Sequence, residues 1–133
     1  MAEEFVVATG DKESKYELLH RQVAALVEGE SDAIANMANI AAMIDATFHF
    51  WCSRIAYGRG VCGTARREGR TIVVEDVDKF EGHIACSSAS RSEIVVPMIK
   101  DGVVVGVLDV DSEHLATFDD VDKVWLERIV KHL

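Results

Sequence analysis

The sequence predicts an α+β protein in which a central, mostly antiparallel sheet packs against N-terminal and C-terminal helices. Two segments with helical periodicity come first, several short β-rich runs follow, and an amphipathic segment comes last. Two of the β-rich runs flank Asp101-Gly102, a dipeptide typical of hairpin turns. A length of 133 residues suits one domain. We expect residues 1–12 to be a flexible tail and residues 13–133 to form that domain.

Apolar spacing predicts the two N-terminal helices. Four apolar residues recur at helical intervals and therefore share one face: Tyr16, Leu19, Val23 and Leu26. Ser31 is expected to cap a second helix over residues 32–48. That helix is apolar on most sides, which indicates that it lies between the sheet and another element.

The middle of the chain combines strand and loop signals. Residues 53–57 and 71–76 have the composition of strands, residues 65–69 suit a short helix, and residues 77–91 suit a loop. The string GRGVCG matches a dinucleotide-binding pattern, but the crossover helix that this pattern requires does not fit before the next strand. The glycines are therefore expected to let the backbone turn sharply.

The final helix is predicted from a cap and an apolar stripe. Asp119 can cap a helix that continues to the last residues. Val121, Val124 and Ile129 are expected to face the core.

Charge and hydropathy exclude several classes of function. The net charge of −9 argues against nucleic acid or an anionic membrane as a partner. No apolar run reaches membrane-spanning length, and the acidic N-terminus lacks the layout of a signal peptide. We therefore expect a cytoplasmic protein, in which thiols stay reduced unless they are used in chemistry.

Three cysteines, Cys52, Cys62 and Cys86, lie within one short stretch that is also rich in arginine. An arginine beside a thiol favours the nucleophilic thiolate. The hydroxyls of Ser87, Ser88 and Ser90 could donate hydrogen bonds to a Cys86 thiolate. These features favour redox or covalent chemistry.

Two alternatives are open for the cysteines. Each could be a small buried hydrophobe. Cys52, Cys62, His83 and Cys86 could also form a zinc site, but they lack the close cysteine pair of a zinc knuckle. We therefore expect no metal and no cofactor.

Three acidic residues interrupt the most apolar part of the chain. Asp109 and Asp111 lie two residues apart, so they share one face of their strand. Glu93 precedes the other strand of the predicted hairpin. If all three meet, their crowding holds a proton on one carboxyl group and lets the cluster bind an ammonium group. Alternatively, these acids lie at the ends of their strands, where their side chains face water.

The register of the hairpin decides whether Glu93 joins the other acids. A two-residue turn pairs Lys100 with Val103 and places Glu93 on the opposite face. A three-residue bulged loop pairs Ile99 with Val103 and places Glu93 across from Asp109. Both faces are apolar, so hydrophobicity does not distinguish the registers. We predict the bulged loop because it gathers the carboxylates into one site.

From Cys52 to the final helix, the chain resembles the free methionine-R-sulfoxide reductases, a catalytic branch of the GAF-domain fold. The strings that carry this resemblance are CSRIAYGRGVCGTA, VEDVDKFEGHIACSSASRSEIVVPM, GVLDVDS and FDDVDKVWLERIV. The cysteine spacing also matches. The resemblance implies a GAF-like arrangement of the predicted sheet and helices.

The resemblance also implies a reaction. Cys86 would attack the sulfoxide sulfur of free methionine-(R)-sulfoxide and become a sulfenic acid. A carboxyl group of Glu93 or Asp111 would protonate the departing oxygen. Cys52 would then form a disulfide with Cys86, and thioredoxin or a similar dithiol would reduce it. Cys62 would be an auxiliary thiol.

The same resemblance implies how the substrate is held. Asp109, with Glu93 and Asp111, would bind the substrate ammonium group. Trp51 matches a tryptophan that contacts the substrate, although it could also be a core aromatic. A homodimer is one candidate assembly. The alternative function is a non-catalytic GAF module that binds a small molecule, but such a module has no need of the three thiols together with the three acids.

The chain departs from the family pattern in one place. In the family, about two strands lie between the N-terminal helices and the first cysteine. Here the second predicted helix runs almost directly into Trp51 and Cys52. We therefore expect a shortened sheet and a less covered substrate site.

Overall fold

The computed structural model describes residues 4–53, 60–82 and 88–133, with only the backbone described at positions 51–53 and 60. Four α-helices, four strands and one short 3-10 helix lie within these residues. In chain order they are α1 (Lys12–Val27), α2 (Ala33–Phe48), β1 (Trp51–Ser53), α3 (Gly60–Glu68), β2 (Ile72–Val74), η1 (Val77–Lys79), β3 (Ser92–Lys100), β4 (Val103–Ser112) and α4 (Asp120–Val130). The predicted order of helices, strands and a final helix is confirmed.

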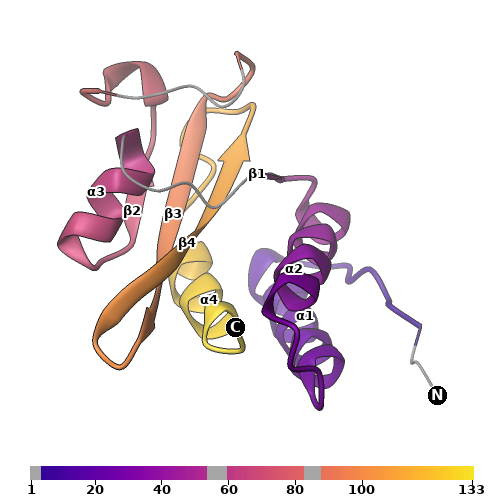
Figure 1. Cartoon of the computed structure of the whole chain (residues 1–133). Helices are drawn as coiled ribbons and strands as arrows, with labels where there is room; N and C mark the ends of the chain where they lie inside the picture. The colour runs from indigo at the N-terminus through magenta and orange to yellow at the C-terminus, as the bar shows by residue number, and fades with distance from the viewer. Residues whose placement is uncertain (1–3, 54–59, 83–87) are drawn as a thin grey trace.

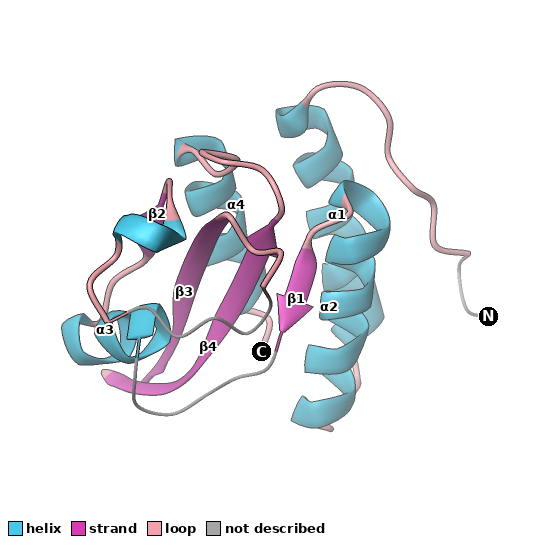
Figure 2. Ribbon diagram, turned by 90° about the horizontal axis from the view of Figure 1, so that it is seen from above, coloured by secondary structure: helices cyan, strands magenta, loops and turns pink. Residues whose placement is uncertain are grey.

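The described strands form one antiparallel sheet in the order β1-β4-β3-β2, with helices on both faces. Helices α1, α2 and α4 cover one face, and α3 covers the other (Figures 1 and 2). The long hairpin of β3 and β4 stands at the centre and belongs to both layers.

Two hydrophobic clusters follow from this layering. The larger one, here the helix-side core, fills the space between the sheet and helices α1, α2 and α4. Its buried members include Tyr16, Leu19, Val23, Ile40, Ile44, Ile94, Val96, Val110, Leu126 and Ile129. The smaller one, here the α3-side core, contains Val61, Cys62, Ala65, Ile72, Val74, Val77, Val95 and Val107. Alternate residues of β3 and β4 enter the two clusters, as the period of a strand requires.

Side-chain caps define where the first two helices begin. Asp11 caps α1 by accepting a hydrogen bond from the backbone N–H of Ser14. Asp32 caps α2 and accepts from the N–H groups of Ile34 and Ala35. The prediction that Ser31 caps this helix was wrong by one residue.

The segment before α1 contacts the helix that follows it. Residues 4–11 contain no helix or strand. The backbone of Val6 exchanges two hydrogen bonds with the side chain of Gln22, at 2.8 and 3.0 Å. Phe5 packs against the helix-side core. The flexibility expected for residues 1–12 stays a prediction, and Lys12 already belongs to α1.

The hairpin turn differs from the prediction. Lys100 pairs directly with Val103, so the loop contains two residues and not three. Asp101 and Gly102 have φ angles of 51° and 75°. Positive φ at both positions is the signature of a type I′ turn, which matches the twist of the flanking strands. The predicted bulged loop was therefore wrong.

An irregularity in β4 changes the register beyond the turn. Ile99 pairs with Val104, whereas Met98 pairs with Gly106, so Val105 has no counterpart on β3. This β-bulge shifts every later residue of β4 to the other face. Val104 and Val107 consequently both contact the α3-side core.

The start of α4 is bound to α1 through a buried carboxylate. Asp119 caps α4, as predicted, and forms a capping box with Asp122. Asp122 is fully buried and accepts hydrogen bonds from Lys12 Nζ at 2.6 Å and from Tyr16 Oη at 2.6 Å. Val124, which was predicted to face the core, is 44% exposed. The buried face of α4 thus includes Asp122, whereas Val124 lies outside it.

Replacing Asp122 should strongly destabilise the protein. Asp122→Ala leaves Lys12 and Tyr16 without their shared acceptor and breaks the capping box. We expect the free energy of unfolding to fall by about 3 kcal/mol. Asp120→Ala is the matched control, because Asp120 lies in the same helical turn but is exposed. It should cost about 0.5 kcal/mol. Urea denaturation measures both, and similar losses would contradict the role of Asp122.

Candidate active site

The bulge in β4 brings three acidic side chains to the face of the sheet that α3 covers. Glu93 pairs with Asp111, and Val95 pairs with Asp109. Glu93 therefore lies across from Asp111 and diagonal to Asp109 on the same face. The predicted gathering of the three carboxylates is confirmed, but the predicted pairing of Glu93 with Asp109 was wrong by two residues along β4.

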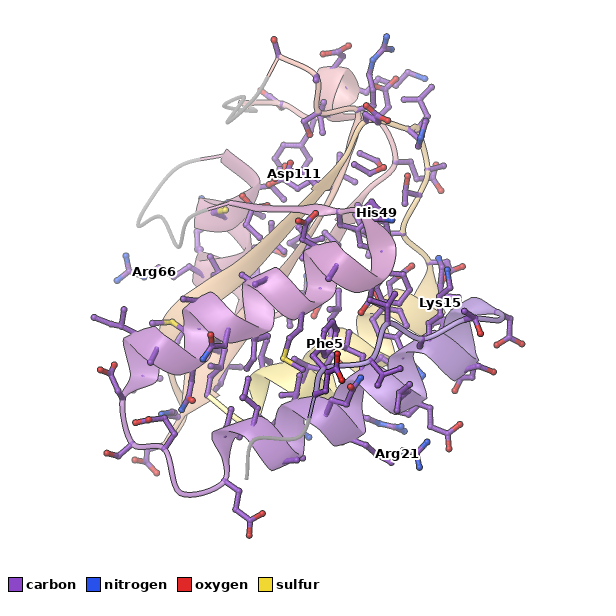
Figure 3. The ribbon with its side chains drawn as sticks, turned by 90° about the vertical axis from the view of Figure 1, so that its right-hand side faces the viewer. Phe5, Lys15, Arg21, His49, Arg66 and Asp111 are labelled. Carbon is purple, nitrogen blue, oxygen red and sulfur yellow. The ribbon has the colours of Figure 1, made fainter. Side chains whose placement is uncertain are left out.

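These acids are buried and do not face water at strand ends. Glu93 and Asp111 are each 4% exposed, and Asp109 is 1% exposed. Asp111 lies near the end of β4, where β1 pairs with that strand (Figure 3). The site is thus enclosed on the two central strands of the sheet, near one of their ends.

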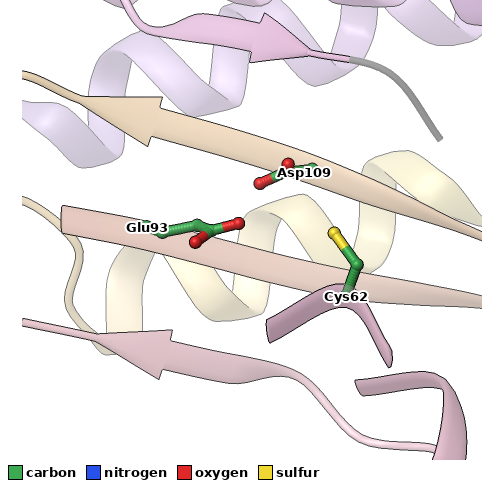
Figure 4. A group of neighbouring side chains, drawn as sticks. All are labelled: Cys62, Glu93 and Asp109. Carbon is green, nitrogen blue, oxygen red and sulfur yellow. The ribbon is translucent and has the colours of Figure 1, made fainter. Parts of the chain in front are cut away.

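Helix α3 adds a thiol to this cluster. Cys62 lies one turn into α3 and is 8% exposed. Its Sγ and one carboxylate oxygen each of Glu93 and Asp109 lie within 4.8 Å of one another. Figure 4 shows the three side chains converging from α3, β3 and β4. Cys62 therefore belongs to the wall of the carboxylate site.

Burial and crowding hold a proton on Glu93. Desolvation has the largest effect, a hydrogen bond with Asp109 adds to it, and the charges of Asp109 and Asp111 act in the same direction. Together they raise the pKa of Glu93 to about 10. Glu93 is therefore a neutral acid at physiological pH, beside carboxylates that favour a cation.

Ser90 contacts a different partner from the one expected. Its Oγ donates a hydrogen bond of 2.8 Å to Asp111 Oδ1, and both side chains are buried. The sequence had suggested that Ser90 could donate to Cys86, its near neighbour along the chain. The β3–β4 pairing explains the contact with Asp111, because Ser90 lies two residues before β3 and close to the end of β4.

Several predicted site residues lie outside what the structure describes. Cys86 and His83 fall in the undescribed range 83–87. Trp51 and Cys52 are described by their backbone alone, which pairs with Asp111 and Val110 respectively. Their predicted roles stay predictions. The structure does place β1 directly beside the strand that carries the site.

The arginines of the cysteine-rich stretch are exposed where the structure describes them. Arg66 and Arg67 are exposed, and Figure 3 shows Arg66 pointing outward from α3. Arg70 forms an ion pair with Glu68 at 2.6 Å. The carboxyl groups of Glu93 and Asp109 lie close to Cys62. Arg54 and Arg59 lie outside the described residues, so the predicted effect of the arginines on the thiols stays a prediction.

The thiol and carboxyl groups of this cluster could bind a metal ion only after they lose their protons. Cys62, Glu93 and Asp109 are a possible set of three ligands among the described residues. This set differs from the zinc ligands considered from the sequence. A metal must displace the proton of Glu93 and that of the thiol, so the arrangement favours proton chemistry over metal binding.

Comparisons with known proteins decide the family. The GAF domain model matches residues 17–133. The free methionine-R-sulfoxide reductase of Escherichia coli is 36% identical over 92% of this chain and 88% of that protein. A solved free methionine-R-sulfoxide reductase of Neisseria meningitidis, in complex with its substrate, covers 97% of this chain and 92% of that chain, with 40% identity and a TM-score of 0.89. The chain belongs to the free methionine-R-sulfoxide reductase family, with a GAF fold.

A further relative indicates that this family member is short. GAF domain-containing protein A of Dictyostelium discoideum is 44% identical over 156 aligned positions, covering 100% of this chain and 99% of that protein. The present chain has 133 residues, so at least 23 of these positions have no residue here. This difference agrees with the expected loss of chain relative to the family. Among the described helices, none is long and apolar enough to span a membrane.

The raised pKa of Glu93 predicts how stability depends on pH. Its folded-state pKa of about 10 lies above the ordinary 4.5, so between these values the native protein binds one more proton than the unfolded chain. Stability should therefore fall as pH rises through this interval. Glu93→Gln cannot ionise, so its stability relative to wild type should increase with pH.

Chemical denaturation from about pH 5 to about pH 9, inside that interval, measures this difference. Glu75→Gln is the control, because Glu75 is an exposed glutamate at the end of β2. Its curve should run parallel to that of wild type. A parallel curve for Glu93→Gln would show that Glu93 titrates normally.

Proposed function

We propose that the protein reduces free L-methionine-(R)-sulfoxide to L-methionine. Membership of the family supports this proposal, as does the substrate complex of the solved relative. The structural observation that carries it is the buried, protonated Glu93 beside two further carboxylates. Sulfoxide reduction needs a proton donor in a dry site, because the sulfoxide oxygen leaves as a hydroxyl group.

In the proposed first step, the Cys86 thiolate attacks the sulfur of the substrate. A new S–S bond forms while Glu93 donates its proton to the sulfoxide oxygen. The S–O bond of the substrate and the new S–S bond then break as the hydroxyl group is transferred to the Cys86 sulfur, and methionine leaves as the thioether. The substrate sulfur is reduced by two electrons, and Cys86 is oxidised to a sulfenic acid.

The second step restores the thiol. The Cys52 thiolate attacks the sulfenic sulfur of Cys86, the S–O bond breaks, and a Cys52–Cys86 disulfide forms. The departing hydroxide leaves as water after taking up the proton that Cys52 released on ionising. Thioredoxin or a similar dithiol in the cytoplasm then reduces this disulfide. In the second step Cys62 is an auxiliary thiol, beside the carboxyl groups of Glu93 and Asp109.

The remaining groups of the site suit a free amino acid. Asp109 and Asp111 provide negative charge for the substrate ammonium group, which peptide-bound methionine sulfoxide lacks. Trp51 would contact the methyl-sulfoxide end, since the backbone of β1 lies beside Asp111. Enclosure of the carboxylates strengthens both interactions. The proposed specificity therefore rests on charge as well as on shape. The homodimer stays a prediction.

Turnover with defined substrates tests the activity. Thioredoxin-coupled oxidation of NADPH should proceed with free methionine-(R)-sulfoxide and fall by at least about a thousandfold in Cys86→Ser, because the nucleophile is lost. Glu93→Gln should lower the rate by about a hundredfold or more through loss of the proton donor. Equal rates with the S epimer or with N-acetylated substrate would refute the proposed specificity. A bound small molecule without turnover would instead indicate a binding module.

The roles of the other two cysteines are separable. Cys52→Ser should still release one equivalent of methionine per protein in a single turnover, because Cys86 is intact, but recycling by thioredoxin should be at least about tenfold slower. Cys62→Ser should keep both phases within about threefold of wild type, since serine preserves a donor of similar size. Quenched-flow assays of methionine release measure the burst and the steady state. The assignment would be contradicted if Cys62→Ser lost the burst of methionine release while Cys52→Ser kept the steady-state rate of wild type. Cys62 would then be the resolving thiol and Cys52 the auxiliary one.

A further inference from the structure

We propose that Ser90 is a positioning residue that keeps Asp111 ionised and so leaves the transferable proton of the site on Glu93. This inference rests on the proposed function, in which Glu93 is the proton donor. It assigns a task to a side chain that is four positions from Cys86 along the chain but contacts the carboxylates in space.

The contact itself favours one protonation state. Ser90 Oγ donates to Asp111 Oδ1 at 2.8 Å, where Ser90 is 6% exposed and Asp111 is 4% exposed. A hydroxyl that donates to a carboxylate stabilises the ionised form. The effect is larger in an enclosed site than in water, because the surrounding dielectric is low.

The backbone around Ser90 holds this hydroxyl in place. Arg91 donates its N–H to Ser112 O at 2.8 Å, and Val77 donates its N–H to Arg91 O at 2.9 Å. The residue after Ser90 is thus hydrogen-bonded on both sides. These bonds hold the backbone beside Ser90 against the end of β4, and so keep its side chain within reach of Asp111.

The described groups around Asp111 differ from the Ser90 hydroxyl in their effect on its charge. Glu93 faces it from β3, and Asp109 lies on the same face of its own strand. Cys62 of α3 lies near both of those acids, and the partner position on β1 is the uncharged Trp51. Glu93 shares a hydrogen bond with Asp109, which fixes a proton between them. The Ser90 hydroxyl favours charge on Asp111, so the three carboxyl groups are not equivalent.

The pH dependence of kcat/KM tests the assignment with three variants. In Ser90→Ala, Asp111 competes for the proton, and the acid limb of the profile should move upward by about one to two pH units, equivalent to a ten- to hundredfold change in proton affinity. Ser90→Thr keeps the hydroxyl and should restore the wild-type profile. Above the shifted limb, the rate of Ser90→Ala should approach that of wild type.

Ser92→Ala is the matched control for simple destabilisation. Ser92 is also fully buried, but its Oγ donates to the backbone carbonyl of His114 at 2.6 Å. It neighbours Glu93 in β3 and therefore lies on the other face of the sheet. Ser92→Ala should lower stability and leave the limbs of the profile unmoved. A Ser90→Ala profile that is lower than wild type but identical in shape would overturn the proposal.

Carboxyl NMR tests the same assignment in the unaltered protein, even if Ser90→Ala fails to fold. With 13C-labelled aspartate and glutamate side chains, Asp111 should be ionised and Glu93 protonated at neutral pH. Asp111→Asn and Glu93→Gln assign the two signals. A protonated Asp111 would overturn the role of Ser90. Absence of sulfoxide turnover in the wild type would instead refute the proposed function, whatever the carboxyl signals show.

Discussion

One unpaired residue in β4 holds the site together. Val105 forms a bulge that shifts the register of the hairpin after its first two pairs. Without it, the type I′ turn would place Asp109 and Asp111 on the face of the helix-side core, opposite to Glu93. Their carboxyl groups would then lie on the same face as the apolar side chains of Ile94 and Val96. The bulge therefore makes a tight turn compatible with a shared carboxylate site.

Crowding then gives these carboxylates their chemistry. Helix α3 covers them and contributes Cys62, so water is largely excluded from the space between α3 and the hairpin. In such surroundings, three like charges cost more free energy than two charges and a neutral acid. The fold thereby stores a proton on Glu93 where an oxygen must be protonated. The same carboxylates that raise its proton affinity also attract an ammonium group.

The sequence predicted the elements and the chemistry better than the contacts. Periodicity placed Asp109 and Asp111 on one face, and Asp101-Gly102 marked the hairpin. Gly106 follows the bulged residue, and an isolated glycine within a strand is the signal that could have indicated the bulge. Hydrophobicity does not distinguish the registers because both faces are apolar, so the predicted partner of Glu93 was two residues away from the observed one. The assumption that the three acids meet placed Glu93 on the correct face of the sheet. The reason was wrong, because the bulge lies at Val105 and not in the loop.

Other errors arose where distant parts of the chain meet. A helical pattern assigns a valine such as Val124 to the core and an acid to the surface. Asp122 is buried because Lys12 and Tyr16 supply its hydrogen bonds from the other end of the chain. Ser90 likewise was linked with a neighbour in sequence, whereas strand pairing gives it Asp111. Side-chain partners of this kind follow from the tertiary fold, which local patterns do not contain.

The bond between Lys12 and Asp122 joins residues 110 positions apart. Helices α1 and α4 share the helix-side core, and α4 contributes Leu126 and Ile129 to it. During synthesis, the first helix therefore emerges from the ribosome long before its partner exists. Contacts this remote along the chain carry a high entropic cost of loop closure and slow folding. The apolar faces of α1 and α2 consequently stay incompletely covered until α4 has been translated.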